Sequence, residues 1–308
     1  MQVVLVNVFI LFMLLLIGYL MGVRKIVSHS SINDITNILI DVSIPCTIVL
    51  SMIRPYDARL MGDALKVIVV VLLYYIVMTV VSFFVTKLLK VDDSKRGSWM
   101  FATVFSNNGF IGYPLMFALY GKDGLFIMAI ANIVQNVLIF SLGIKLIIMN
   151  YNIDEKINLK RVVFTKQNLA VLIGGIIFLT GFPVAQPVET LLTYVANLTV
   201  PLSMMVVGLS LSRYDAKNMF KDFEAYRLTI FRMVIVPALI IVLFRVLHID
   251  AGKSLPYAIL FYTAALPSPA FTSIMAERYS TSIEFSSKCV FLTTVLSVIT
   301  VPFFAGIL

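Results

Sequence analysis

The nine residues SNNGFIGYP, at positions 106–114, are polar and broken by glycine although they lie inside a long apolar segment. A second apolar segment is interrupted in the same way by LPSP at positions 266–269. Hydrocarbon cannot satisfy free backbone N–H and C=O groups, so a helix broken at membrane depth must be buried in protein or line a cavity. A matched pair of breaks, one in each half of a chain, indicates the binding site of a secondary transporter. We therefore expect the function at these two breaks.

The composition places the chain in a membrane. Of its 308 residues, 60% are apolar and 13% are charged, whereas soluble domains carry about 25% charged residues. The alternation of apolar and polar residues that marks an outer-membrane barrel is absent. The sequence thus predicts an all-α membrane protein in a lipid bilayer. The net charge of +8 fits the excess of Lys and Arg in cytoplasmic loops and gives no reason to expect a nucleic acid partner.

A helix needs roughly 20 residues to cross the hydrocarbon, and by this measure we predict ten spans. They cover residues 3–22, 31–53, 64–89, 98–120, 124–149, 168–181, 186–211, 227–247, 254–276 and 283–307. The first lacks the basic region and the cleavage site of a signal peptide, so we expect it to be retained. Lys and Arg concentrate in the odd-numbered loops, which the positive-inside rule places in the cytoplasm. Both termini of this multi-pass protein are then expected outside the cell membrane.

The two halves of the chain resemble one another. The segment SIPCTIV at 43–49 is similar to TVPLSMM at 199–205, and Pro114 has a counterpart in Pro269. Because each half holds five predicted spans, the second copy must be inverted, as in many secondary transporters. We expect a first five-helix repeat over residues 1–150, a cytoplasmic linker over 151–167 and an inverted second repeat over 168–308.

The broken spans four and nine are suited to an anion. Each inner half-helix presents an N-terminus, with unsatisfied N–H groups and the positive end of its dipole. Amides add donors without a fixed charge, and glycines allow close approach of a ligand. The substrate-binding candidates at the breaks are Asn107, Asn108, Gly109, Gly112, Pro114, Pro267, Ser268 and Pro269. The alternative is that these residues only cap and pack a kinked helix.

Span five carries three amides within five residues, Asn132, Gln135 and Asn136. Amides inside a membrane can join helices instead of binding a ligand, so both roles are open for each of them. Three amides exceed what helix association requires, and we take Gln135 and Asn136 as the candidates for the substrate.

Asp41 is the one acidic residue predicted well inside a span, about 15 Å from its cytoplasmic end at 1.5 Å per residue. An intramembrane carboxyl is a functional hypothesis, here a proton-coupling group or a contact at the site. The alternative is an ion pair or hydrogen bond to a neighbouring span. By contrast, Arg232 and Lys288 are predicted near cytoplasmic ends, where snorkelling or local pairing accounts for them.

No motif indicates an enzyme or a cofactor. The sequence has no His-Glu-x-x-His, no Gly-x-Ser-x-Gly and no Walker loop. His29 and His248 are too far apart to predict a metal site, and Cys46 and Cys289 are expected to be unpaired within spans.

The chain resembles the auxin efflux carrier family, which includes plant auxin exporters and bacterial permeases associated with malate and malonate. The resemblance rests on residues 107–114, similar to the family's Asn…Gly-x-Pro crossover, and on Pro45, Pro201 and Pro267/Pro269. It covers essentially the whole chain, without the long cytoplasmic loop of many plant members.

The resemblance implies the fold of bile-acid/sodium symporters. Spans one, two, six and seven would form a scaffold, and spans three to five with eight to ten would form a transport unit that moves in an elevator-type manner. Spans four and nine would cross at Pro114 and Pro267/Pro269, with the substrate between the units. Asn107 would lie beside the substrate carboxylate and Gln135 behind it, with Ser43 and Pro45 on the scaffold side. A homodimer through the scaffold is also implied.

Sodium-coupled relatives carry an acidic residue at the span-nine crossover, where this chain has Tyr262–Leu266. Proton coupling or facilitated diffusion is therefore favoured over sodium coupling. The sequence predicts a secondary transporter of small organic anions that works by alternating access. The alternatives are a cation or proton antiporter of related fold and a membrane sensor that binds a ligand without moving it.

Overall fold

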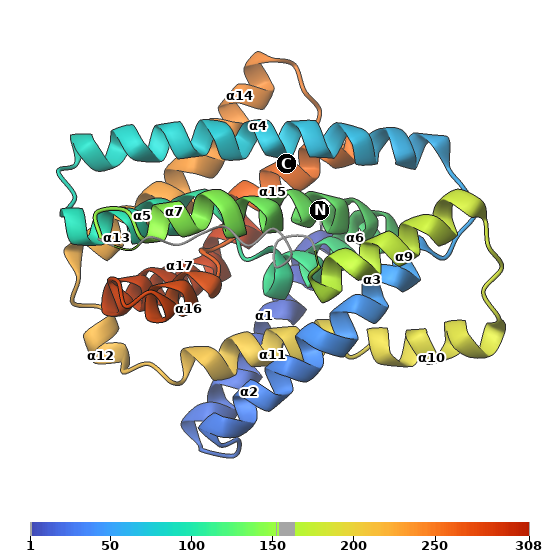
Figure 1. Cartoon of the computed structure of the whole chain (residues 1–308), viewed down its shortest axis with the longest axis horizontal. Coiled ribbons are helices and arrows are strands. Elements are labelled where there is room, and N and C mark those ends of the chain that lie inside the picture. Colours follow the sequence, from blue (N-terminus) through green and yellow to red (C-terminus); the bar gives the residue numbers. More distant parts are fainter. Residues whose placement is uncertain (1, 152, 154–163, 308) are drawn as a thin grey trace. The chain divides into compact units, whose positions relative to one another are not determined.

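The computed structural model describes residues 2–151, 153 and 164–307, and every regular element within them is helical (Figure 1). The α-helices are α1 (Gln2–Val23), α2 (His29–Ile38), α3 (Ile44–Met52), α4 (Ala58–Leu88), α5 (Asp93–Val104), α6 (Tyr113–Leu138), α7 (Ile144–Ile147), α9 (Lys166–Thr180), α10 (Gln186–Ala196), α11 (Thr199–Leu211), α12 (Ala216–Met219), α13 (Phe223–Ile230), α14 (Val236–Val246), α15 (Leu255–Ala265), α16 (Phe271–Arg278) and α17 (Ile283–Ala305). Most of the predicted linker, residues 154–163, lies outside the described residues.

The described residues contain four π-helical turns. Three of them join neighbouring α-helices into longer helices, and Asn108–Gly112 begins the helix that continues as α6. The four turns are Leu39–Ser43, Asn108–Gly112, Ile139–Gly143 and Phe231–Ile235. A π turn adds one residue to a helical turn and frequently occurs at a functional site. The first contains Asp41, the second contains the predicted glycines, and the fourth contains Arg232.

Seven helical segments are long and apolar enough to cross a membrane, in the part of the chain that the structure describes. They are Val6–Val23, Ser30–Met52, Ala58–Leu88, Asp93–Ile147, Gln186–Leu211, Phe223–Val246 and Ile283–Ala305, and two shorter apolar helices are Lys166–Thr180 and Leu255–Ala265. The 55-residue segment Asp93–Ile147 covers the predicted span four and all but the last two residues of the predicted span five. This confirms a multi-pass, all-α membrane protein, while the ten-span inverted repeat stays a prediction.

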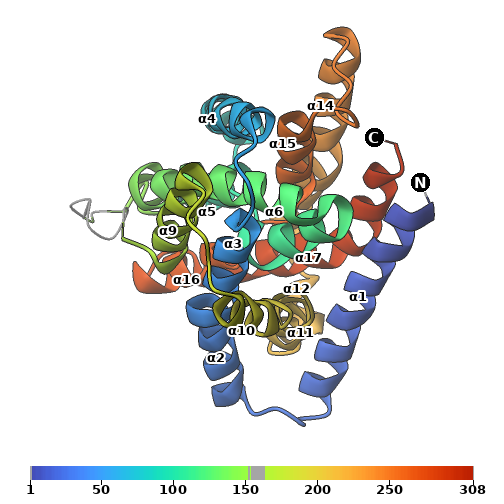
Figure 2. The ribbon, with the colours of Figure 1, turned by 90° about the vertical axis from the view of Figure 1, so that its right-hand side faces the viewer.

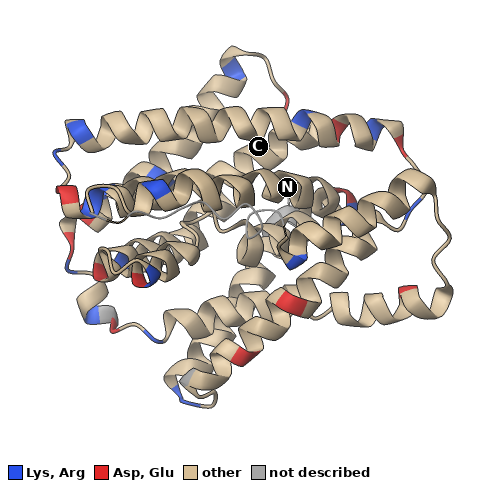
Figure 3. Cartoon of the chain, in the orientation of Figure 1, with Lys and Arg blue, Asp and Glu red and all other residues tan. Residues whose placement is uncertain are grey.

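The 31-residue helix α4 illustrates how lipid shapes these helices. Its charged residues lie toward its two ends (Figure 3). Apolar side chains such as Leu73, Val77 and Phe84 are more than half exposed along its length. Such a helix is stable only where lipid covers the apolar side chains.

The chain forms two compact units. The first comprises Met1–Leu65, Gly109–Ile133 and Val163–Tyr214, and the second comprises Lys66–Asn108, Val134–Val162 and Asp215–Leu308. Spans one, two, six and seven thus fall in the first unit, together with the segment Gly109–Ile133.

In the first unit, α1 packs along α11, and α3 packs against α9 and α10 (Figure 2). Glycines permit the close approach of α1 and α11, because a Cβ atom on Gly18 would collide with the Met205 carbonyl and one on Gly208 with the Leu15 carbonyl. Small residues at such contacts are typical of helices that associate in a membrane.

In the second unit, α17 packs against α5, α13, α15 and α16. Trp99, Phe101 and Phe105 are fully buried there. Gly97 brings α5 onto the backbone of α7, since a Cβ at this position would collide with the Leu146 carbonyl. This packing holds the end of α5, and hence the first predicted break, in a fixed place.

Candidate functional site at the helix breaks

Both predicted breaks are breaks in the structure. Helix α5 ends at Val104, Phe105 is extended, and helical structure resumes at Asn108. Helix α15 ends at Ala265, Leu266 is extended, and α16 begins at Phe271. Each break leaves the last backbone carbonyls of its helix without an intrahelical partner.

The two breaks supply hydrogen-bond partners for each other's backbone groups. The Asn107 N–H donates to the Pro267 carbonyl at 2.9 Å. The Ser106 hydroxyl donates to the Thr263 carbonyl of α15 at 2.5 Å, and the Ser268 hydroxyl donates to the Ala102 carbonyl of α5 at 2.7 Å. Each serine thus binds a carbonyl in the last turn of the opposite helix. Residues that are about 160 positions apart in sequence therefore form one polar crossover inside the second unit.

Gln135 holds the first break in position. Its Oε1 accepts hydrogen bonds from the Ser106 N–H at 3.1 Å, the Asn108 Nδ2 at 3.0 Å and the Tyr75 hydroxyl at 2.6 Å. Its Nε2 donates to the Ser106 carbonyl at 3.0 Å. Gln135 therefore joins α4, the break and its own helix.

Arg232 is the residue that the sequence reading placed wrongly. It lies nine residues after the start of its helix at Phe223, about 13 Å along the axis, and its exposed fraction is 0%. Its guanidinium donates to the carbonyl of Thr103, to the hydroxyl of Ser106 at 2.6 Å and to the carbonyl of Leu266 at 3.1 Å. It does not snorkel, because both breaks offer it backbone carbonyls in the interior.

A sequence signal for Arg232 did exist. It is the only charged residue between Arg227 and Arg245, and an ionisable residue inside a span is a functional hypothesis by default. The prediction that the span begins at Arg227, when the helix begins four residues earlier, moved Arg232 toward the cytoplasmic end.

The breaks are closed to solvent. The exposed fraction is 4% for Asn107 and 0% for Asn108 and Ser268. Two buried atoms here, Asn108 Oδ1 and Arg232 Nε, have no hydrogen-bond partner among the described groups. A buried polar atom without a partner is costly, so it needs water or a ligand.

The remaining candidates are described by their own surroundings. Ser43 lies in the first unit, where its hydroxyl bonds the Thr199 hydroxyl at 2.5 Å and the Val195 carbonyl at 3.0 Å. Pro45 lies in the first turn of α3. Asn136 is half-buried, and Asn132, from the same helix, bonds the Tyr113 hydroxyl at 2.9 Å.

Asp41 forms an ion pair with Lys166, with 2.6 Å between Oδ2 and Nζ. The Asp41 side chain is 41% exposed and the Lys166 side chain 58%. The pairing with a neighbouring helix, one of the alternatives considered for Asp41, is therefore present.

A cavity of about 400 Å³ lies in the first unit, between α1, α3, α6, α10 and α11. Pro114 lines it, as do the polar residues Asn7, Thr47, Ser51, Lys122 and Asn197. This volume is in the range of small-molecule sites.

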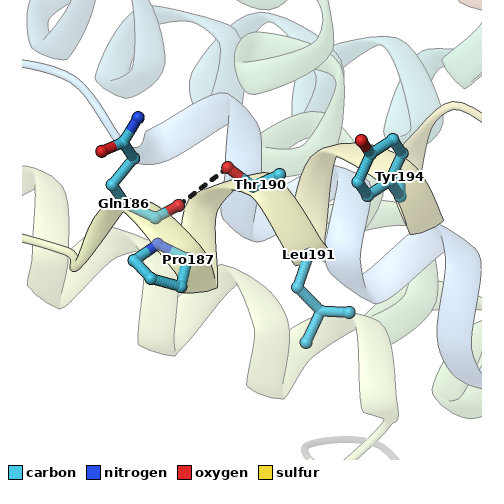
Figure 4. A pocket seen from close by; sticks show the side chains of 5 residues that line it. All are labelled: Gln186, Pro187, Thr190, Leu191 and Tyr194. Carbon is cyan, nitrogen blue, oxygen red and sulfur yellow. Dashed lines mark hydrogen bonds between the residues drawn. The ribbon is translucent and has the colours of Figure 1, made fainter.

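Figure 4 shows a second, shallower pocket on the surface of the first unit. A single helix, α10, supplies the residues that line it, which are Gln186, Pro187, Thr190, Leu191 and Tyr194. The hydrogen bond drawn there joins Thr190 to the Gln186 carbonyl at 2.9 Å, within the same helix.

Comparison with known proteins gives a consistent result. Residues 3–305 match the model of a family described as membrane transport protein. An uncharacterized transporter of Methanothermobacter thermautotrophicus is 26% identical over 296 residues, which are 96% of this chain and 95% of that protein. An uncharacterized transporter of Methanocaldococcus jannaschii is 26% identical over 305 residues, which are 98% of this chain and 97% of that protein. The chain therefore belongs to the membrane transport protein family, which is the auxin efflux carrier family.

Proposed function

We propose that this transporter carries small organic carboxylates by alternating access, with the substrate bound at the two helix breaks. The observation that carries the proposal is the buried polar crossover, in which the Asn107 N–H meets the Pro267 carbonyl and Gln135 fixes Ser106 and Asn108. Unwound backbone in a membrane is tolerated where it lines a binding site.

The residue types at the crossover favour an anion. Asn107, Asn108 and Ser268 carry N–H and O–H groups that a bound anion would share with their present acceptors, Pro267, Gln135 and Ala102. Helix α16 and the helix that resumes at Asn108 begin at the breaks. Helix N-termini bind anions through free N–H groups and the dipole. The sequence has no Asp or Glu in residues 94–122 or 251–276, so no carboxylate of these segments competes with the substrate.

The two compact units support a division into a scaffold and a transport unit. The first unit contains spans one, two, six and seven, and the second contains the crossover. The segment Gly109–Ile133 of spans four and five falls in the first unit, whereas the resemblance assigns these spans to the transport unit. In the first unit, Ser43 contacts Thr199, its counterpart 156 residues later in the predicted repeat, which supports the inverted repeat. We propose that the second unit moves with its substrate, that the assembly is a homodimer through the first unit, and that Asp41 is the proton-coupling group.

Charge movement on a solid-supported membrane tests this function. Purified protein is exposed to jumps of malate, malonate and indole-3-acetate, with Asn107→Ala as the matched inactive variant and its melting temperature as a control for folding. We expect a current with at least one anion that the variant loses. Counterflow of labelled substrate distinguishes a carrier from a sensor, since a sensor binds in a fixed stoichiometry and exchanges nothing.

A cation antiporter is disfavoured by Arg232. A fully buried guanidinium bonded to both breaks repels a cation at the same place, whereas it attracts a carboxylate. If sodium or proton jumps produced current and all three carboxylates were silent in both assays, the carboxylate proposal would be wrong.

A further inference from the structure

Arg232 is a buried cation whose bonds are all to uncharged groups. Its acceptors are the carbonyls of Thr103 and Leu266 and the hydroxyl of Ser106. The ion pairs among the described residues do not include it. The sequence has no Asp or Glu in residues 225–249, and the segments that form the breaks have none either. The charge of Arg232 is thus not cancelled by an acidic side chain of these segments.

The partial charges at the helix ends must be added to the charge of Arg232. Thr103 and Leu266 lie at the C-terminal ends of α5 and α15, and each such end is equivalent to about −0.5 elementary charge. Arg232 therefore offsets the two C-terminal ends. The helices that begin after the breaks, at Asn108 and at Phe271, contribute about +0.5 each at their N-termini. An empty crossover consequently carries about one uncompensated positive charge.

We propose that Arg232 sets the charge of the crossover that the transporter's moving unit carries through the membrane, so that one bound carboxylate makes the crossover neutral and an empty crossover is positive. This inference rests on the proposed function and deepens it, because it names singly charged carboxylates as the preferred substrates. Moving an uncompensated charge through the membrane is expensive. The return of the empty unit is therefore the slow step, and the transporter exchanges anions faster than it releases them.

The consequence can be measured on the unaltered protein in proteoliposomes. Labelled indole-3-acetate is followed in exchange, with unlabelled anion on the other side, and in net efflux, with none. We expect exchange to be at least about tenfold faster than net efflux. An inside-negative potential should accelerate net efflux, by up to about tenfold per 60 mV for one full charge, because it draws the positive empty crossover inward. The rate of exchange should not respond to the potential, since the crossover stays loaded and neutral in both directions.

Three variants assign the effect to Arg232. Arg232→Lys keeps the charge and should keep the excess of exchange over efflux. Arg232→Gln keeps a hydrogen-bond donor but removes the charge, so the ratio of the exchange rate to the net-efflux rate should fall to about one. The matched control is Arg227→Gln on the same helix, because Arg227 is partly exposed and paired with Glu224, and its variant should keep the excess.

The preference for singly charged carboxylates is tested with malonate and malonamate, two compounds of nearly equal size that differ by one charge. Malonamate should compete better for exchange. Equal rates of exchange and net efflux in the unaltered protein, or a preference for malonate, would overturn the inference and leave carboxylate transport intact. Absence of exchange with every carboxylate would instead remove the proposed function, and this inference with it.

Discussion

Gln135 and Arg232 solve the same chemical problem with different side chains. A broken helix exposes carbonyls and N–H groups that hydrocarbon cannot satisfy. Gln135 offers an acceptor and a donor in one amide and bonds both the N–H and the carbonyl of Ser106. Arg232 offers donors only, and it bonds the ends of two helices at once. Together with the serines, these side chains hold the second unit's crossover in one conformation.

The Asp41→Asn substitution tests the proton-coupling proposal. Protonation of Asp41 would cancel its half of the ion pair with Lys166. The substitution imitates the protonated form at every pH, so the pH dependence of transport should become flat between about pH 4 and pH 8. Uptake by proteoliposomes over this range measures it, with Asp34→Asn on the exposed face of α2 as the control. An unaltered pH profile would assign the Asp41 pair a structural role.

Among the elements, the contact of α1 with α11 is the most demanding in its packing. The Gly208→Ala change places a methyl group against the Leu15 carbonyl, and the two helices must separate to accept it. We expect a loss of stability of about 1–3 kcal/mol, measured as a lower melting temperature in detergent. The matched control is Gly175→Ala in α9, where a Cβ meets nothing within 4 Å. This control should be neutral or stabilising, because Ala is the better helix former.

The start of α13 gives a prediction about pH. Asp222 caps this helix by accepting from the N–H groups of Glu224 and Ala225, and Lys95 Nζ lies 3.0 Å from its Oδ2. Burial raises the pKa of Asp222, but the bonds from Lys95 and Ala225 outweigh it, and the pKa is lowered overall. The stabilisation is therefore complete above the ordinary value of about 4 and is lost as pH falls through the folded-state pKa.

Two substitutions separate the charge of Asp222 from its capping role. Asp222→Asn keeps a capping oxygen and loses the charge, so the difference in melting temperature between pH 7 and pH 3 should shrink. Asp222→Ala also loses the cap and should cost about 1 kcal/mol more at pH 7. A pH difference unchanged in Asp222→Asn would mean that other carboxylates cause the acid sensitivity.

For the whole molecule, the orientation in the membrane is the prediction that the loop charges make. Ser94→Cys, in the third loop, should be protected from an impermeant maleimide added to whole cells, and Gly252→Cys, in the eighth, should be labelled. Both variants are made in a chain without Cys46 and Cys289, so that only the new thiol reacts. The reverse pattern would place both termini in the cytoplasm.

The sequence by itself determined the class of the protein, the places of both helix breaks and the family. Pro267 and Pro269 cannot continue the hydrogen bonds of a helix, and the polar run 106–108 stands before Gly109 and Gly112 in an apolar segment. A chain with 60% apolar residues has no soluble core to form. Residues 106–108 and 266–269 were therefore found from local chemistry, and so was the amide Gln135.

Only the tertiary structure decided which residues form hydrogen bonds with one another at the breaks. The bonds of Ser106 to Thr263, of Ser268 to Ala102 and of Arg232 to both breaks join residues that are far apart in sequence. Periodicity and composition describe which face of a helix is apolar, but they do not specify which distant carbonyl lies opposite a given side chain. The same arginine can snorkel at a helix end or satisfy a buried break, and the choice depends on whether folding brings unpaired carbonyls within its reach.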